Sequence, residues 1–144
     1  KLTALMGQSG CGKTTLMRLL AGVHVSHARI TMESFELLAC SCISYCPQNS
    51  CHWPSEMRVK DILLFAAQLQ NTSLQDHMHI IGRLGLGPLM NHQHCQLSGG
   101  QSQRMNIAAT LLCPLPALIL LDEPLAALDE QTSYEVLDLL CSLP

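Results

Sequence analysis

Aromatic and charged residues are scarce in this sequence, and both shortages limit what the chain can do. Aromatic side chains make up 3% of the 144 residues and charged side chains 13%, whereas 48% are hydrophobic. This composition indicates a heavily buried sheet, or a surface that further chain or partners cover. The net charge is −3 and no run of Lys or Arg occurs. Binding of nucleic acid through a basic surface is therefore not expected.

The sequence also lacks an apolar run long enough to cross a membrane. Its most apolar stretch, residues 108–121, is interrupted by Pro114 and Pro116. That stretch is shorter than the roughly 20 residues that a transmembrane helix needs. We therefore expect no membrane span in the 144 residues of this chain.

Cysteines, by contrast, are numerous, and four of the eight lie between residues 40 and 51, next to His52. Zinc coordination is one interpretation of this group, but the group contains no C-x-x-C pair. Buried thiols are the interpretation that we favour. A disulfide framework is not expected, because such frameworks are typical of short secreted chains.

Short apolar runs alternate with stretches of helical periodicity, which is typical of α/β proteins. The runs at residues 2–6 and 117–121 predict buried strands, and residues 43–46 predict a further strand before Pro47. Gly22 is placed to end the first helix, and residues 73–84 predict a further helix before a loop over 85–96. Apolar residues on one helical face predict helices at Leu16, Leu19, Leu20 and Val23; Ile62, Phe65, Ala66 and Leu69; Met105, Ala108, Ala109 and Leu112; and Val136, Leu139, Leu140 and Leu143.

A glycine-rich loop at residues 7–14 fits the pattern G-x-x-x-x-G-K-[ST], between a predicted strand and a predicted helix. Glycines let such a loop wrap a phosphate with backbone N–H groups, and the helix N-terminus adds positive potential. Lys13 is placed to bind β- and γ-phosphates, the Thr14 hydroxyl to bind Mg²⁺, and Thr15 to donate to the α-phosphate. The predicted nucleotide-binding residues of the loop are Gly7, Ser9, Gly10, Cys11, Gly12, Lys13, Thr14 and Thr15.

Two adjacent carboxylates, Asp122 and Glu123, end the apolar run that closes at Leu121. A buried strand that ends in two acidic residues indicates a functional site, because unpaired charges are costly there. Asp122 is suited to hold Mg²⁺. Glu123 is suited to act as the general base that polarises an attacking water.

The segment at residues 97–104, LSGGQSQR, resembles the signature motif of ATP-binding cassette (ABC) proteins. The glycine-rich loop, Gln48 after Tyr45-Cys46-Pro47, the signature, Asp122-Glu123 and then residues 125–129 also follow the order of that family. The resemblance implies an α/β fold: a P-loop NTPase core with a mainly parallel sheet, plus a helical signature-motif subdomain. The core is expected over residues 1–48 and 114–144, and the helical subdomain with the signature helix over 49–113.

The resemblance also assigns roles to residues. In the family two cassettes pack head to tail, so that the signature of one covers the γ-phosphate held by the other. This implies nucleotide contacts from Ser98, Gly99, Gly100 and Gln101. Asp129 is expected to contact the partner across that interface. Lys13, Gln48 and Glu123 are the expected catalytic residues, and Thr14, Gln48 and Asp122 the expected metal-binding residues.

ATP and Mg²⁺ are thus the expected cofactors, and hydrolysis is expected to power transport. The implied partners are a second nucleotide-binding domain and the transmembrane domain of a transporter, at the cytoplasmic face of a membrane. A soluble ABC protein of translation or DNA repair is an alternative. Its ribosome-acting members usually show Asn-His-Leu-Asp where this chain has Ala126-Ala127-Leu128-Asp129. A truncated, non-hydrolysing nucleotide-binding module is a third interpretation.

The chain departs from the family at both ends. Family members begin with antiparallel strands that carry an adenine-stacking aromatic residue, whereas this chain starts at the strand before the loop. They also carry a switch histidine about thirty residues beyond the acidic pair, and no His follows Glu123 here. We therefore expect the 144 residues alone to bind nucleotide weakly and to hydrolyse little of it.

Overall fold

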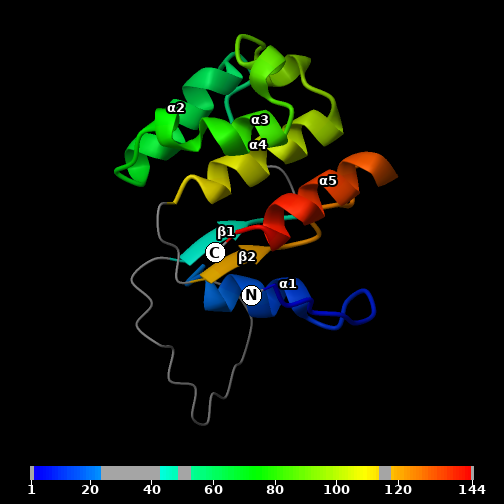
Figure 1. Cartoon of the computed structure of the whole chain (residues 1–144). Helices are drawn as coiled ribbons and strands as arrows, with labels where there is room; N and C mark the ends of the chain where they lie inside the picture. The colour runs from blue at the N-terminus through cyan, green and yellow to red at the C-terminus, as the bar shows by residue number, and fades with distance from the viewer. Residues whose placement is uncertain (1, 24–42, 49–52, 114–117, 144) are drawn as a thin grey trace.

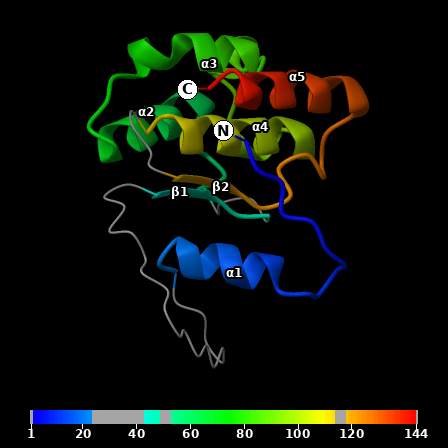
Figure 2. The ribbon, with the colours of Figure 1, turned by 60° about the horizontal axis from the view of Figure 1, so that its bottom comes forward.

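A computed structural model of the chain describes residues 2–23, 43–48, 53–113 and 118–143. A small parallel sheet lies between helices on its two faces (Figures 1 and 2). The helix α1 (Lys13–Leu20) covers one face, and α2 (Val59–Leu69), α3 (Met78–Arg83), α4 (Gly99–Leu111) and α5 (Glu130–Cys141) lie on the other side. This layered α/β arrangement confirms the predicted fold class.

The sheet pairs β1 (Ile43–Cys46) with β2 (Leu118–Leu121) in parallel, with Ile43 opposite Leu118 and Cys46 opposite Leu121. One further hydrogen bond, from Asp122 N to Cys46 O at 2.9 Å, continues the pairing beyond the last paired residues. Both strands are predicted from their apolar runs, but β2 is less buried than predicted, because Leu118 is 38% exposed and only Leu120 of the strand is buried. Parallel pairing brings the residues that follow the two strands to the same edge of the sheet.

The predicted strand at residues 2–6 is wrong, because the structure assigns no strand there. Leu2, Leu5 and Met6 are instead 53%, 47% and 88% exposed. An apolar run supplies side chains for burial, but a strand forms only where a neighbouring strand accepts and donates backbone hydrogen bonds. Within the described residues the sheet consists of β1 and β2, and residues 2–6 pair with neither strand.

Helix α1 is flanked by two glycines with left-handed backbone dihedral angles. Gly12 precedes the helix with φ 96°, and Gly22 follows it with φ 71°. At the C-terminal end Val23 N donates to Arg18 O at 2.8 Å and Gly22 N donates to Leu19 O at 3.0 Å. These paired bonds form a Schellman motif, which confirms that Gly22 ends the helix.

The core lies between the sheet and the helices of residues 53–113. Helix α2 packs against α4, and Leu63 of α2 and Ile107 of α4 are fully buried. The predicted face of α2 is partly wrong, because Phe65 and Leu69 are exposed. Apolar residues occur on most sides of α2, so periodicity alone does not select the face that contacts α4. The buried face of α2 consists of Val59, Ile62, Leu63, Ala66 and Ala67.

The helix predicted over residues 73–84 is divided into a 3₁₀ turn, η1 (Leu74–His77), and α3. Gly85, with φ 63°, follows its end. The expected loop beyond it contains two 3₁₀ turns, η2 (Gly87–Leu89) and η3 (His94–Gln96), and leads to α4. Within the part of the chain that the structure describes, no helix combines the length and the apolar character needed to span a membrane.

The start of α4 is fixed by a capping box. The Ser98 hydroxyl accepts a hydrogen bond from Gln101 N at 3.2 Å, and the Gln101 side chain accepts one from Ser98 N at 2.9 Å. These two bonds satisfy N–H groups that a helix start leaves without partners. Helix α5 buries Val136, Leu139 and Leu140, as its apolar stripe predicts. The domain boundaries expected from the sequence stay a prediction.

Candidate functional site

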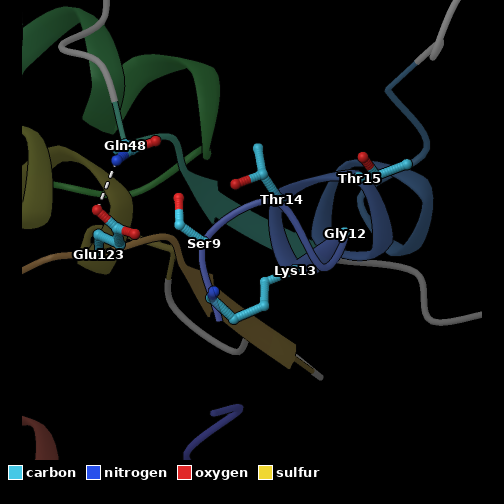
Figure 3. A pocket seen from close by; sticks show the side chains of 8 residues that line it. Ser9, Gly12, Lys13, Thr14, Thr15, Gln48 and Glu123 are labelled. Atoms are coloured by element: carbon cyan, nitrogen blue, oxygen red, sulfur yellow. Dashed lines mark hydrogen bonds between the residues drawn. The ribbon is translucent and has the colours of Figure 1, made fainter. Parts of the chain in front are cut away.

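Three separate segments meet in a hollow of about 230 Å³ at the edge of the sheet. The glycine-rich loop and the start of α1 form one side, and single residues that follow β1 and β2 form the other (Figure 3). We call this the first hollow. Its lining residues are Ser9, Gly10, Gly12, Lys13, Thr14, Thr15, Gln48 and Glu123. The order of the strands explains the convergence, because ligands of α/β proteins bind outside the carboxyl ends of parallel strands.

Glycines shape the loop of the first hollow. Gly10 and Gly12 have φ values of 81° and 96°, a backbone region that residues with side chains rarely adopt. At Gly7 a Cβ atom would lie 2.7 Å from the Cys11 sulfur, so a side chain there would collide. Gly7 and Cys11 thus fix the shape of the loop without lining the hollow, although the sequence predicted both as nucleotide contacts.

The Lys13 ammonium lies against the loop. Its Nζ donates to Gly7 O at 2.8 Å and to Gln8 O at 3.0 Å. Carbonyl oxygens stabilise a cation by their dipoles but do not neutralise its charge. The loop therefore holds a positive charge beside a helix N-terminus, an arrangement that attracts phosphate.

Asp122 is buried, whereas its neighbour Glu123 is exposed. The Asp122 side chain is 2% exposed, and its Oδ2 has no hydrogen-bond partner among the described residues. A buried carboxylate oxygen without a partner is costly unless a cation or a donor reaches it. This oxygen is of the type that Mg²⁺ prefers, so the residue fits the metal that the resemblance implies, although Asp122 is not among the lining residues of the first hollow.

Glu123 projects into the first hollow and accepts a hydrogen bond from the Gln48 side chain (Figure 3). Its backbone has φ 49°, although it precedes Pro124, which disfavours helical conformations in the residue before it. A side-chain-bearing residue in the left-handed region is strained, and such residues cluster at functional sites. The structure thus brings together Lys13, Gln48 and Glu123, the three residues predicted to be catalytic.

A second hollow of about 400 Å³ lies at the start of α4, beside the turn that leads to α5. Its lining residues are Ser98, Gly100, Gln101, Arg104, Ala127, Leu128, Asp129 and Thr132. The structure thus brings Asp129 to the signature residues. Gly99 is not among the lining residues, although the sequence predicted a nucleotide contact from it.

Asp129 is the N-cap residue of α5. Thr132 donates to both of its carboxylate oxygens, from the backbone N at 2.9 Å and from the hydroxyl at 2.7 Å. These hydrogen bonds, and more weakly the charge of Arg104, hold the pKa of the Asp129 carboxyl below its ordinary value. The contact from Asp129 to a partner stays a prediction, and the structure adds a role for it within its own chain.

Arg104 and Thr132 are site residues that the sequence analysis missed. Arg104 lines the second hollow and donates from Nη1 to Leu84 O, at the end of α3, at 2.8 Å. Its position could have identified it, because Arg104 is the last residue of the signature segment and lies one helical turn after Gly100. Thr132 has no motif of its own. Only the capping geometry of Asp129 identifies it.

The zinc interpretation gains no support from the described residues. Cys46 is buried, as expected for a thiol in the core. Cys40, Cys42, Cys51 and His52 lie outside the described residues. Elsewhere in the part of the chain that the structure describes, no three His, Cys, Asp or Glu side chains are grouped in a way that could hold a metal ion.

Comparison with known proteins gives a consistent result. The sequence model of the family described as "ABC transporter" matches residues 1–126. The molybdenum import ATP-binding protein ModC of Brucella suis is 35% identical, in a match that covers 94% of this chain and 41% of that protein. The chain thus spans about two fifths of the length of that relative.

Two solved structures extend the comparison. A putative metal-chelate type ABC transporter in an inward-facing conformation is 34% identical, with a TM-score of 0.68, covering 94% of this chain and 54% of its own. The complex of the archaeal ribosome recycling factor aABCE1 with a ribosomal stalk protein is 32% identical, with a TM-score of 0.66, covering 90% of this chain and 24% of its own. Transport proteins and a ribosome recycling factor thus share this fold.

Proposed function

The chain belongs to the ABC transporter family, and from this membership we propose that it binds ATP with Mg²⁺ in the first hollow and hydrolyses it to power transport. The observation that carries the proposal is the convergence of Lys13, Gln48 and Glu123 on one hollow. A phosphate-binding cation, an amide and a carboxylate from distant parts of the sequence share this space. That combination suits phosphoryl transfer, which depends mainly on positioning and charge stabilisation.

Nucleotide binding is assigned to the loop and the start of α1. The backbone N–H groups of the loop are proposed to surround a phosphate, because glycines with positive φ, such as Gly10 and Gly12, allow successive amides to turn toward one side. Lys13 needs only to exchange its bonds to the Gly7 and Gln8 carbonyls for bonds to phosphate oxygens. Ser9 and Thr15 add hydroxyl donors on the lining of the hollow.

Thr14, Gln48 and Asp122 are the residues that would hold Mg²⁺. When bound, the metal supplies positive charge that neutralises the phosphate oxygens during phosphoryl transfer. Thr14 and Gln48 offer oxygen atoms on the lining of the hollow. Asp122 offers the buried Oδ2 that lacks a partner within the described residues. Side-chain oxygens of these types match the ligand preference of the metal.

Glu123 is the residue proposed to accept the proton of the attacking water. Its carboxylate is exposed within the first hollow, so water can reach it. The hydrogen bond from Gln48 occupies one of its oxygens, which leaves acceptor positions for water. A general base of this kind contributes about 10²- to 10⁴-fold to the rate of a reaction.

We propose that residues of the second hollow contact the nucleotide held by a paired cassette. Ser98, Gly100 and Gln101 lie at the N-terminus of α4, where helix geometry favours an anion. A second nucleotide-binding domain, identical or different, would bring its own nucleotide there. The transmembrane domain of a transporter, at the cytoplasmic face of a membrane, is the proposed further partner.

A role on ribosomes is the second candidate, favoured by the 32% identity to the aABCE1 structure. Intact mass and top-down sequencing of the native polypeptide that contains this chain would separate the two. Blocks of about 20 apolar residues beside the cassette would support transport. A second cassette without any such block would support the soluble alternative.

The decisive test of the proposed chemistry is Glu123→Gln in that native polypeptide, assayed as Mg²⁺-dependent release of phosphate from ATP. We expect kcat to fall about 10²- to 10⁴-fold while ATP still binds, because the amide keeps the shape but cannot accept the proton. Glu130→Gln, an exposed change at the first residue of α5, is the matched control and should leave kcat unchanged. An equal loss in both variants, or no loss in Glu123→Gln, would contradict the assignment.

A further inference from the structure

Two neighbouring glycines at the start of α4 have different surroundings. A Cβ atom built on Gly100 would lie 3.0 Å from the Ala127 carbonyl oxygen and 3.4 Å from Leu128 Cδ2. A Cβ atom built on Gly99 would meet nothing within 4 Å. Both residues are helical, so neither needs glycine for its backbone angles. At Gly100 the segment that contains Ala127 instead approaches closely, so a side chain there would push against the Ala127 carbonyl.

That segment is a short, hydrogen-bonded loop between the two hollows. We call residues 124–128 the connecting loop. Ala126 N donates to Glu123 O at 3.2 Å, and Leu128 N donates to Leu125 O at 3.0 Å. Leu125 and Leu128 pack against the core. The loop is therefore held along its length, with Glu123 of the first hollow at one end and Asp129 of the second hollow at the other.

The two ends of the connecting loop differ in how firmly they are fixed. Asp129 is bonded to Thr132 through both carboxylate oxygens. Glu123 has a strained backbone, with φ 49°, and its exposed side chain is bonded to Gln48. A displacement of the Ala127 carbonyl is thus opposed at the Asp129 end and is more easily transmitted toward Glu123.

We propose that Gly100 is a positioning residue for Glu123, acting within one chain through the connecting loop. Its missing side chain lets the Ala127 carbonyl approach α4, and this approach sets the loop that carries the general base into the first hollow. A methyl group at position 100 displaces that carbonyl by a few tenths of an ångström. The inference rests on the proposed function, because it concerns the placement of the base in that reaction.

The first test compares Gly100→Ala with Gly82→Ala in the native polypeptide that contains this chain. Gly82 is an exposed helical glycine of α3, and a Cβ atom there would meet nothing within 4 Å. We expect Gly100→Ala to lower kcat about 10-fold with little change in KM, because small displacements of a reacting group reduce rates steeply. Gly82→Ala should leave both constants unchanged. Equal kcat in the two variants would overturn the proposal.

A second comparison separates this role from a contact with the nucleotide of a paired cassette. In a Glu123→Gln background, Gly100→Ala should lower the residual rate no further, because the two changes act on the same group. ATP-dependent pairing of cassettes, followed by light scattering, should also persist in the double variant. A further fall in rate, or loss of pairing, would show that the added methyl group impairs the site for the partner's nucleotide and does not act through Glu123, which would overturn the positioning role.

Hydrogen exchange without nucleotide tests the inference independently of activity. We expect the amides of residues 125–129 to exchange faster in Gly100→Ala and at the wild-type rate in Gly99→Ala. Unchanged exchange in Gly100→Ala would overturn the proposal even if the protein hydrolyses ATP. If the wild type hydrolyses none, the proposed function fails, and the exchange result still decides whether Gly100 sets the connecting loop.

A milder variant covers the case in which Gly100→Ala does not fold. Ala127→Gly alters an exposed residue and loosens the connecting loop without changing α4. We expect it to speed amide exchange at residues 125–129 and to lower kcat several-fold at constant KM. Faster exchange with an unchanged kcat would show that the connecting loop does not place the general base, and would overturn the proposal.

Discussion

Residues 2–23 and residues 53–113 keep their shapes by different means. None of residues 2–23 is buried, and their glycine-rich loop and helix end are defined by dihedral angles and short-range hydrogen bonds. In residues 53–113, by contrast, α2, α3 and α4 bury apolar side chains in one core. The chain therefore presents its phosphate-binding loop from a locally determined segment, and its signature residues from a segment that depends on packing.

The two regions also differ in how far apart in the sequence the residues lie that determine each structure. A Schellman motif at Gly22 needs only residues within one helical turn. The buried face of α2 is chosen by what α4 presents to it, and α4 lies some thirty residues further along the sequence. Changes in the first region should therefore affect binding more than folding, and changes in the second should affect folding first.

The largest expected contrast comes from the same substitution in both regions. Leu63→Ala removes a fully buried side chain of α2 and should lower the free energy of unfolding by about 2–5 kcal/mol. Leu16→Ala, in α1, removes a side chain that is 42% exposed and should cost about 0.5 kcal/mol or less. Urea unfolding followed by circular dichroism measures both. Equal losses would mean that α1 is as well packed as α2.

A smaller effect, on binding alone, is expected from Lys13→Met. The loss of a charged donor to phosphate should weaken ATP binding by about 10- to 100-fold, with the free energy of unfolding nearly unchanged. Arg18→Met removes an exposed cation from the same helix and should leave ATP affinity unaltered. Calorimetric titration with ATP compares the two. A loss of stability in Lys13→Met would show that its carbonyl contacts fold the loop.

The smallest expected effect is on the pH dependence of stability. It comes from Asp129, the N-cap residue of α5, which lies outside both regions. Its pKa is lowered from 3.8 in the folded chain, chiefly by the hydrogen bonds from Thr132. The folded state therefore favours the ionised carboxylate, and this contribution is present above the unfolded pKa and is lost as the pH falls through the folded one.

Unfolding midpoints of the wild type and Asp129→Asn, measured from pH 6 down to pH 2, test this sign. We expect a small, constant difference above about pH 5, because the carboxylate is then ionised in both states. The two proteins should converge as the pH falls below 3.8, the ordinary value of the group. If the difference between the two midpoints grew as the pH fell, the protonated carboxyl would be a better cap than the carboxylate.

Much of the first hollow could be predicted from the sequence, because its parts are locally encoded. The loop at residues 7–14, the helix end at Gly22, and the strands before Gln48 and Asp122 each follow from a few adjacent residues. Parallel pairing then follows from the α/β alternation, and it places Gln48 and Glu123 at one edge.

What the sequence could not supply depends on residues distant in the chain. The apolar run at residues 2–6 predicts a strand, but a strand also needs a neighbouring strand, which an apolar run does not specify. On α2, Phe65 and Leu63 are equally apolar, and only contact with α4 selects Leu63 for the core. The approach of the Ala127 carbonyl to Gly100 has no sequence signal at all, since both neighbouring glycines belong to the same motif.

The pairing of β1 with β2 also has a kinetic consequence. Gln48 and Glu123 are 75 positions apart, and the strands that carry them close a loop of about that length. Contacts so distant in sequence form slowly, whereas helices and their near neighbours form quickly. During synthesis on the ribosome, residues 53–111 leave the exit tunnel before β2 does. We therefore expect α2 and α4 to associate first, and the first hollow to be completed only later, when β2 emerges and pairs with β1.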